Sequence, residues 1–251
     1  MDLDLTDRVY VVTGGARGLG RATADVLVAD GARVVLSGRT EQTLATARAE
    51  LGDAVETVVA DNADPAAPGR LIAAARARWG RLDGALISVG GPPTGSVTSV
   101  TDEQWTSAFE SVFLGAVRLG RELGAALPSG GSLAYVLSSS VRAPLADLAI
   151  SNGLRPGLAM VAKTLADELG PAGVRVNGLL PGRIGTERVA ELDASTGDAA
   201  AAREAATRTI PLGRYGEPAE FGRVAAFLLS PASSFVSGAM VPVDGGMLRA
   251  L

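Results

Sequence analysis

The sequence predicts an α/β fold: a single doubly wound domain over residues 1–251, with a mostly parallel, seven-stranded sheet. Short apolar runs rich in β-branched residues alternate with longer stretches of helical periodicity along the whole chain. Alternation of this kind buries a parallel sheet between helices on both of its faces. No linker, repeat or low-complexity tract divides the chain, and its length is ample for one large core.

Seven segments are expected to form strands, because they are short, mostly apolar runs, several of them rich in β-branched residues. They are 8–13, 33–37, 55–60, 84–88, 132–137, 174–180 and 239–243. Six intervening segments are expected to be helical: 18–30, 41–51, 65–79, 101–127, 187–207 and 218–229. A further helix runs through 158–169. Pro156 places its start near residue 156 or, if the helix begins earlier, a kink inside it.

Missing residue types exclude several kinds of chemistry. The chain has no cysteine and no histidine, which excludes disulfides, a thiolate nucleophile, a Ser-His-Asp triad and a cysteine or histidine metal site. The net charge of −4 provides no basic surface for nucleic acid or an anionic membrane. No apolar run approaches the ~20 residues of a membrane span. Because the N-terminal residues lack a signal-peptide pattern, we expect a cytoplasmic protein. Because cysteine and histidine ligands are missing, we expect no metal.

A glycine-rich turn follows the first predicted strand and opens the first predicted helix. Residues 13–20 read Thr-Gly-Gly-Ala-Arg-Gly-Leu-Gly. Small residues let the backbone approach a pyrophosphate, and the helix N-terminus adds free N–H groups and the positive end of a dipole. Glycines also form plain turns, but the strand-turn-helix context favours a dinucleotide site in a Rossmann-type domain.

The end of the second predicted strand indicates which dinucleotide is bound. NAD sites usually place an acidic residue there to hold the ribose 2′-OH. This chain has Ser37, Gly38 and Arg39 instead, and Arg17 lies in the glycine turn. Two guanidinium groups can hold a 2′-phosphate by charge-assisted hydrogen bonds, although both could also be merely solvated. We therefore expect NADP(H) as the cofactor rather than NAD.

Further motifs accompany the glycine turn. They are Asp61 after the third strand, Gly90 at the end of the fourth, the segments 177–186 and 210–220, and Val-Asp-Gly-Gly from residue 243. With the pattern Thr-Gly-x-x-x-Gly-x-Gly, they make the chain resemble the short-chain dehydrogenase/reductase family over nearly its whole length. The resemblance implies an oxidoreductase that acts on a carbonyl or hydroxyl group of a small-molecule substrate with a nicotinamide cofactor.

The resemblance also implies which residues border the cofactor. They are Gly14, Arg17, Gly18, Leu19, Gly20, Arg39, Asp61, Asn62, Gly90, Arg155, Pro181, Gly182, Ile184 and Thr186. The glycines of the turn would border the phosphates, Asp61 the adenine, and Ile184 with Thr186 the nicotinamide end. A loop cap at Asp61 and a helix cap at Thr186 are the alternative roles.

Most catalytic positions of the family are replaced. Its reductases use Asn, Ser, Tyr and Lys, with the last two spaced as Tyr-x-x-x-Lys. Ser138 remains, but Ser151 stands at the Tyr position, Arg155 at the Lys position and Val112 at the Asn position. The family's paired asparagines at the end of the fourth strand are Ile87-Ser88 in this chain.

These replacements remove the usual proton donor. A tyrosine, with an ordinary pKa near 10, can protonate an alkoxide when a neighbouring lysine lowers its pKa. A serine hydroxyl is a far weaker acid, and Arg155 can hold ribose hydroxyls but not donate usefully. Lys163, the only lysine, lies about 12 Å further along the helix. Ser151, water, or Asp147 kept protonated by desolvation remain as proton sources.

Two tyrosines and three arginines are further candidates near this site. Strand alternation turns Tyr135 away from Ser138, so we expect it in the core, whereas Tyr215 is expected in a loop at the lid or the site. Arg142, Arg155 and Arg183 could converge at the mouth and bind an anionic group on the substrate, or could simply be solvated.

Three functions remain open on this evidence. The first is an NADP(H)-dependent oxidoreductase with an altered catalytic set. The second is a non-redox isomerase, dehydratase or cyclase that uses the same pocket, and the third is a catalytically inactive NADP-binding scaffold or sensor. The Ala-rich segment 187–212 is expected to be a lid over the substrate. The resemblance also implies a homo-oligomer, either a dimer or a tetramer.

Overall fold

One sheet of seven parallel strands forms the centre of the computed structural model, which describes residues 2–250. The strands are β1 (Val9–Val12), β2 (Arg33–Gly38), β3 (Val55–Val59), β4 (Gly84–Ile87), β5 (Ser132–Val136), β6 (Arg175–Pro181) and β7 (Met240–Val243). They lie in the order β3-β2-β1-β4-β5-β6-β7. The doubly wound fold is confirmed, and each predicted strand end lies within about one residue of the observed one.

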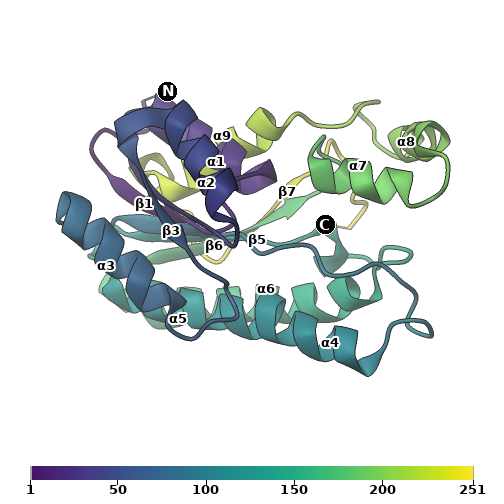
Figure 1. The fold of residues 1–251 in the computed structure, drawn as a ribbon, viewed down its shortest axis with the longest axis horizontal. Coiled ribbons are helices and arrows are strands. Elements are labelled where there is room, and N and C mark those ends of the chain that lie inside the picture. Colours follow the sequence, from purple (N-terminus) through teal and green to yellow (C-terminus); the bar gives the residue numbers. More distant parts are fainter. Residues whose placement is uncertain (1, 251) are drawn as a thin grey trace.

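Helices cover both faces of the sheet (Figure 1). One face carries α1 (Gly18–Ala29), α2 (Glu41–Leu51) and α9 (Pro218–Leu229); the other carries α3 (Ala67–Trp79), α4 (Asp102–Ala108), α5 (Gly115–Ala126) and α6 (Ala149–Leu169). Each face has its own apolar core. Leu36 of β2 packs in the first and its neighbour Val35 in the second, because successive strand residues point to opposite faces.

The strand order reverses between β1 and β4, which are neighbours in space although β2 and β3 separate them in sequence. In open sheets of this type, ligands bind in the crevice at the carboxyl ends of the strands where the order reverses. The turns after β1 and β4 therefore meet at the place where the sequence predicts a dinucleotide.

The predicted helix 101–127 consists of two α-helices joined by a π-helical segment, Phe109–Leu114. A capping box begins it: Thr101 Oγ1 accepts the N–H of Gln104, and Gln104 Oε1 accepts the N–H of Thr101. Val112 lies in the π-helical segment and packs in a small apolar cluster that includes Ile150. Val112 is thus an apolar packing residue in this structure.

Helix α6 begins at Ala149, so the expected start near residue 156 is wrong and Pro156 lies inside the helix. A proline there gives no N–H to the carbonyl four residues earlier, a defect that costs about 3 kcal/mol or more. A tertiary contact supports the N-terminal turns instead. Asn152 accepts the N–H of Leu145 (3.0 Å) and donates to its carbonyl (2.8 Å), which fixes the preceding loop. Ser151 and Arg155 consequently project from one continuous helix.

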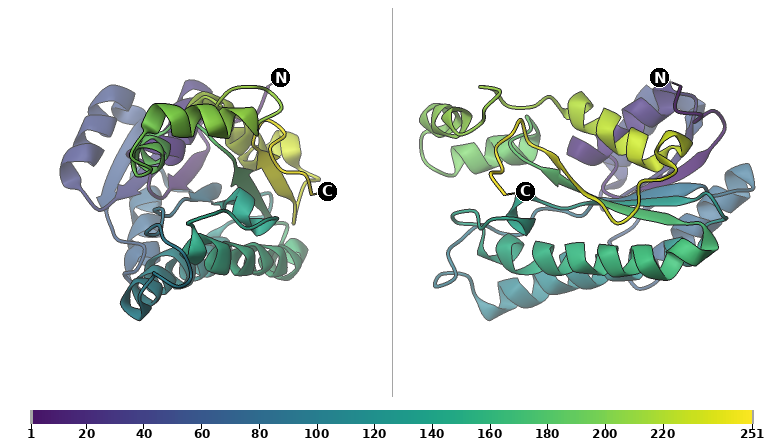
Figure 2. Two further views of the ribbon diagram at one scale, coloured as in Figure 1. Left: turned by 90° about the vertical axis from the view of Figure 1, so that its right-hand side faces the viewer. Right: turned by 180° about the vertical axis from the view of Figure 1, so that it is seen from behind.

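The segment after β6 forms α7 (Glu187–Ala194) and α8 (Ala199–Arg208). The predicted helix 187–207 is therefore two helices, separated at Gly197, which has a φ of 90°. Both helices stand beyond the carboxyl ends of the strands, at one end of the molecule (Figures 1 and 2). Across residues 2–250, we find no helix with the length and apolar character needed to cross a membrane.

Candidate active site

The glycine turn joins the ends of β1 and β4. Thr13 Oγ1 donates to the Ser88 carbonyl (2.7 Å) and accepts the Ser88 N–H (2.8 Å). Gly14 and Gly18 have φ of 58° and 57°, a conformation that favours glycine. A Cβ on Gly20 would lie 2.5 Å from the Gly14 carbonyl oxygen, so only glycine lets α1 begin this close to the turn. The turn is therefore built for close approach of backbone to a ligand.

The N-termini of α1 and α7 meet beside this turn. Arg17 is the N-cap residue of α1, and its side chain makes no capping hydrogen bond. Thr186 caps α7 by accepting the Val189 N–H, and its Cγ2 lies 3.9 Å from the position of a Cβ on Gly18. The alternative role for Thr186, a helix cap, is thus observed. Two positive dipole ends and an open backbone fit a pyrophosphate.

The turn also packs against the end of β2. The N–H of Gly15 donates to the Ser37 carbonyl (3.0 Å), and Ala16 Cβ lies 3.8 Å from the position of a Cβ on Gly38. The next residues in the two segments are residues 17 and 39. Both predicted arginines therefore extend from the carboxyl ends of the neighbouring strands β1 and β2, a place that we call the arginine corner.

The two arginines differ in their contacts. Arg17 Nη1 pairs with Glu187 Oε2 of α7 at 3.3 Å, and the side chains are 65% and 66% exposed. Arg39 is exposed, and no hydrogen bond or ion pair joins it to another residue within 2–250. No acidic residue takes the place of the ribose-binding acid at the end of β2. The arginine corner consequently fits a ligand group with negative charge.

The loop after β3 carries the residues expected at the adenine. Asp61 is exposed and its carboxylate accepts the N–H of Ala63 (2.9 Å), so the alternative loop-capping role is observed. Asn62 Nδ2 donates to the Ser88 carbonyl at 3.4 Å, which ties this loop to the end of β4. The structure thus brings Asp61 and Asn62 to the same crevice as the glycine turn.

The segment after β6 forms the opposite wall. The Gly182 N–H donates to the Val243 carbonyl (3.0 Å), and Pro181 ends β6. Ile184 is buried in the core and forms a backbone bridge with Gly216. This wall therefore carries Thr186 beside the cradle and keeps Ile184 packed behind it.

Three serines connect β5 to α6. Ser138 Oγ accepts the N–H of Ser140 (3.1 Å), and Ser140 Oγ lies 3.2 Å from Ser151 Oγ. Ser140 and Ser151 are buried, whereas Ser138 is half-buried. The structure thus joins the two predicted catalytic serines through Ser140, which sequence reasoning missed. The run of three successive serines, 138–140, was the only signal for it.

Arg155 bridges the ends of β4 and β5. Its Nη1 donates to the Val136 carbonyl (2.8 Å) and its Nη2 to the Gly90 carbonyl (3.4 Å). Nε is buried without a hydrogen-bond partner among the described atoms. Burial lowers the pKa of the guanidinium to about 10, so Arg155 remains a cation at neutral pH. A permanent positive charge therefore lies between the ends of β4 and β5.

All three tyrosines of the chain direct their hydroxyls elsewhere. Tyr135 is buried against α5, where a Cβ on Gly120 would overlap its hydroxyl, and burial raises its pKa. The predicted core role of Tyr135 is confirmed. The Tyr10 hydroxyl donates to the Leu229 carbonyl (3.4 Å) at a site remote from the serines in sequence and fold.

Tyr215 and Lys163 do not replace the missing pair. The Tyr215 hydroxyl donates to the Asp193 carboxylate (3.1 Å), and burial together with this hydrogen bond raises its pKa. Lys163 packs against Gly238, with Nζ 2.5 Å from the position of a Cβ there. Tyr215 therefore supports α7 through Asp193, and the ammonium group of Lys163 lies on another part of α6.

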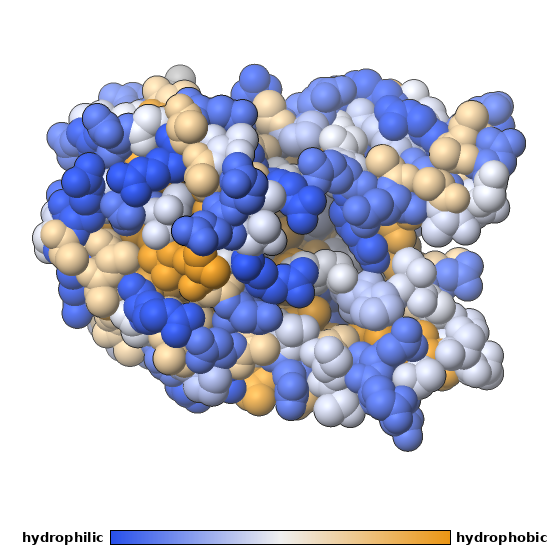
Figure 3. Space-filling model, viewed as in Figure 1, coloured by the Kyte–Doolittle hydropathy of each residue, from blue (hydrophilic) through white to orange (hydrophobic). Residues whose placement is uncertain are grey.

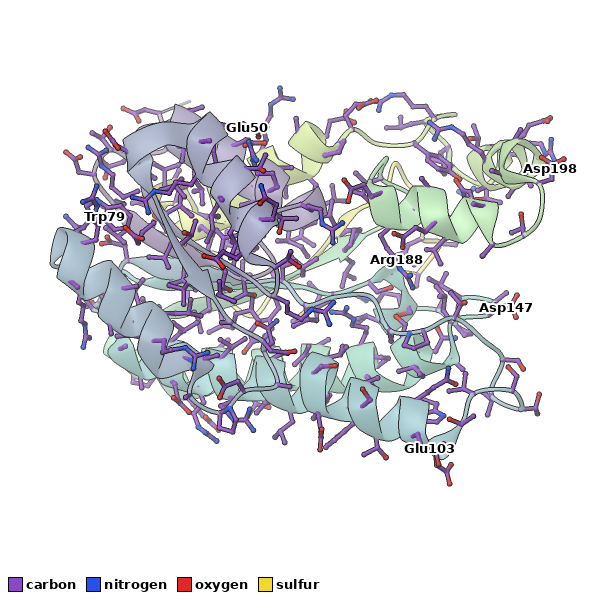
Figure 4. The ribbon with its side chains drawn as sticks, in the orientation of Figure 1. Glu50, Trp79, Glu103, Asp147, Arg188 and Asp198 are labelled. Carbon is purple, nitrogen blue, oxygen red and sulfur yellow. The ribbon has the colours of Figure 1, made fainter. Side chains whose placement is uncertain are left out.

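Two of the open possibilities for charged residues are wrong. Asp147 is exposed at the outer rim and is not desolvated (Figure 4). Arg183 pairs with buried Asp193 at 3.0 Å, and Arg155 donates to backbone carbonyls, so the three arginines do not converge on one anion site. In the described chain, no group of three or more acidic, histidine or cysteine side chains could hold a metal ion.

Arg188 of α7 is a second residue that sequence reasoning missed. Its Nη2 donates to the Pro92 carbonyl (2.7 Å) in the loop after β4, and its Nε lies over Gly91. Figure 4 shows the side chain directed into the space below α7. The surface is hollowed here, between α7 and the layer of α4 and α6 (Figure 3). Arg188 thus links α7 to the loop after β4 across this cleft.

The reversal of strand order and the open glycine turn together define a Rossmann-type domain with a site for a dinucleotide. A family model described as enoyl-(acyl carrier protein) reductase matches residues 14–248. With the relatives described next, this match shows that the chain belongs to the short-chain dehydrogenase/reductase family.

Several oxidoreductases are similar to this protein over nearly the whole chain. An uncharacterized oxidoreductase of Mycobacterium tuberculosis is 34% identical over 247 residues, which cover 96% of this chain and 91% of the relative. Levodione reductase of Leifsonia aquatica is 33% identical over 264 residues, 98% of this chain and 96% of the relative. The solved structure of L-sorbose reductase from Gluconobacter frateurii with NADPH and L-sorbose is 28% identical, with a TM-score of 0.92 and full coverage of both chains.

Proposed function

We propose that this protein is an NADP(H)-dependent oxidoreductase that interconverts a carbonyl and a hydroxyl group with an altered catalytic set. One contrast carries the proposal. The cradle and the two arginines beside it are retained, whereas Ser151 and Arg155 replace the phenol and the ammonium of the family. The NADPH complex of the similar L-sorbose reductase supports the choice of cofactor.

The cofactor would lie along the carboxyl ends of the strands. Gly14, Gly18, Leu19 and Gly20 would border its pyrophosphate at the N-terminus of α1. Arg17 and Arg39 would hold the 2′-phosphate. The other binding residues would be Asp61, Asn62, Gly90, Arg155, Pro181, Gly182, Ile184 and Thr186. The bound nicotinamide supplies or accepts the hydride, and no metal is required.

The chain's own residues would then orient the substrate and move its proton. Ser138 donates a hydrogen bond to the substrate oxygen and positions it. The backbone N–H of Ser140 holds the Ser138 hydroxyl, and the Ser140 hydroxyl holds that of Ser151. Water would replace Asp147 as the proton source. Arg155 stabilises negative charge on the oxygen through its permanent positive charge. Because a strong general acid contributes about 10²- to 10⁴-fold, turnover of ordinary ketones would be slow.

A titration with NADPH and NADH, followed by cofactor fluorescence, tests the cofactor proposal. We expect tighter binding of NADPH and about a tenfold loss in Arg39→Gln, with NADH affinity unchanged. Arg33→Gln, at the other end of β2, is the matched control. Equal affinities for the two dinucleotides would contradict the proposal, and rapid oxidation of NADPH by simple ketones would contradict the altered proton transfer.

The absence of a tyrosine hydroxyl beside the serines, among residues 2–250, favours a second candidate, a catalytically inactive NADP-binding scaffold or sensor. All tyrosine hydroxyls are engaged away from the serines, so no strong acid assists them. A panel of carbonyl and hydroxyl substrates separates the two candidates. Product formed with consumption of NADPH supports the oxidoreductase. NADPH binding without product supports the sensor, and product without NADPH consumption indicates a non-redox isomerase, dehydratase or cyclase.

A homo-oligomer, dimer or tetramer, completes the proposal. Phe109 and Leu114 of the π-helical segment and Met160 of α6 are 45%, 39% and 70% exposed. These large apolar side chains lie on neighbouring helices, as expected for a protein interface. Light scattering should give a mass of two or four chains, and Met160→Arg should lower it.

The segment 187–212 is proposed as the lid over a small substrate.

A further inference from the structure

Two adjacent residues of α7 bond to two different segments that border the cleft. Glu187 pairs with Arg17 beside the glycine turn, and Arg188 donates to the Pro92 carbonyl in the loop after β4. Because α7 begins at Thr186, directly beside Gly18, the first turn of this helix is held next to the cradle. The carboxylate of Glu187 therefore lies at the edge of the proposed phosphate site.

The position of Glu187 draws Arg17 toward the lid. Helix α7 lies on one side of the cradle, and β2 with α2 lies on the other (Figure 1). Arg39 extends from the end of β2, so an Arg17 side chain paired with Glu187 is directed away from the arginine with which it would share a phosphate. The 2′-phosphate and Glu187 are both anions that need the same guanidinium.

We propose that Glu187 sets the preference between NADPH and NADH by competing with the cofactor's 2′-phosphate for Arg17. This inference rests on the proposed NADP(H) binding. NADPH binding must break the pair between Arg17 and Glu187, whereas NADH carries no 2′-phosphate and leaves the pair intact. Glu187 thus weakens NADPH binding selectively, and its removal widens the discrimination between the two dinucleotides.

The size of the effect follows from exposure. Both side chains of the pair are about two-thirds exposed, at 65% and 66%. Exposed ion pairs are weak, so we expect their loss to change affinity by about two- to fivefold. The effect should also shrink at high salt, because salt screens exposed charges.

Dissociation constants of NADPH and NADH, measured by cofactor fluorescence, test the inference without any turnover. In Glu187→Gln we expect about two- to fivefold tighter NADPH binding and little change for NADH. Glu204→Gln is the matched control, because Glu204 also pairs with an arginine in the lid segment, Arg208 at 2.6 Å, but not with Arg17. In an Arg17→Ala background, Glu187→Gln should lose its effect on NADPH.

The outcomes separate the two proposals. A wild-type protein without preference for NADPH overturns the proposed cofactor and this inference together. A wild-type preference that Glu187→Gln leaves unchanged overturns the inference alone. Equal tightening of NADPH and NADH also overturns it, because it shows general repulsion from the pyrophosphate rather than competition for Arg17.

Discussion

The hydroxyl of Ser140 lies 3.2 Å from the hydroxyl of Ser151, and the backbone N–H of the same Ser140 donates to Ser138 Oγ. The strand end of β5 and the helix α6 are thus connected through Ser140, by its backbone N–H on one side and its hydroxyl on the other. Serine is a weak acid, so these hydroxyls can orient a substrate oxygen better than they can supply a proton.

Ser138→Ala should therefore reduce turnover more than cofactor binding. The variant loses the half-buried hydroxyl that would contact the substrate oxygen, and we expect kcat to fall about 10²-fold. Steady-state kinetics and NADPH titration on the same samples check this. Ser139→Ala is the control, because Ser139 is next to Ser138 in sequence but its side chain has no role in the proposed site. An equal loss in both variants would mean that Ser138 only supports the local fold.

Gly120→Ala should be destabilising because of Tyr135. A Cβ at this position of α5 would overlap the Tyr135 hydroxyl, and overpacking of a core costs about 1–3 kcal/mol. Tyr135→Phe removes that hydroxyl but leaves the ring carbon Cζ 2.8 Å from the new Cβ, so it should recover part of the loss in the double variant. Urea unfolding measures all of these free energies. Gly69→Ala in α3 is the control, because no atom lies within 4 Å of its new Cβ. A loss in Gly120→Ala that Tyr135→Phe fails to reduce would contradict the assignment.

The sequence predicts the sheet and the cradle because both follow from local rules. Each strand is a short, mostly apolar run, and a glycine such as Gly20 is required where a helix begins this close to a strand turn. The start of α6 is mispredicted because Pro156 obeys a local rule that the contacts of Asn152 override. Arg188 gave no signal in the sequence, because its partner lies in a loop that is distant along the chain.

Tyr215→Phe should loosen the lid segment without changing the cradle. The Tyr215 hydroxyl and Arg183 both donate to buried Asp193, which anchors α7. Loss of one hydrogen bond costs about 0.5–1.5 kcal/mol, and we expect faster proteolysis at the loop around Gly197. Limited digestion and NADPH titration measure the two effects separately. Tyr10→Phe, which removes a buried hydroxyl far from α7, is the control. An unchanged digestion rate would show that Asp193 holds α7 without Tyr215.

The segment that carries Tyr215 should also lose stability in acid through Glu220. Hydrogen bonds from Arg214 and from the backbone N–H of Glu217 lower the pKa of Glu220 to about 2, below its ordinary value of 4.5. The unfolded chain therefore binds the proton more readily between these values, so stability rises with pH through this window and is lost as pH falls toward 2. Thermal unfolding from pH 2.5 to 6 should show a smaller pH dependence in Glu220→Gln than in the wild type. Glu204→Gln removes another exposed carboxylate bonded to an arginine and controls for net charge. Parallel curves for the wild type and Glu220→Gln would show that this carboxylate does not hold the segment in place.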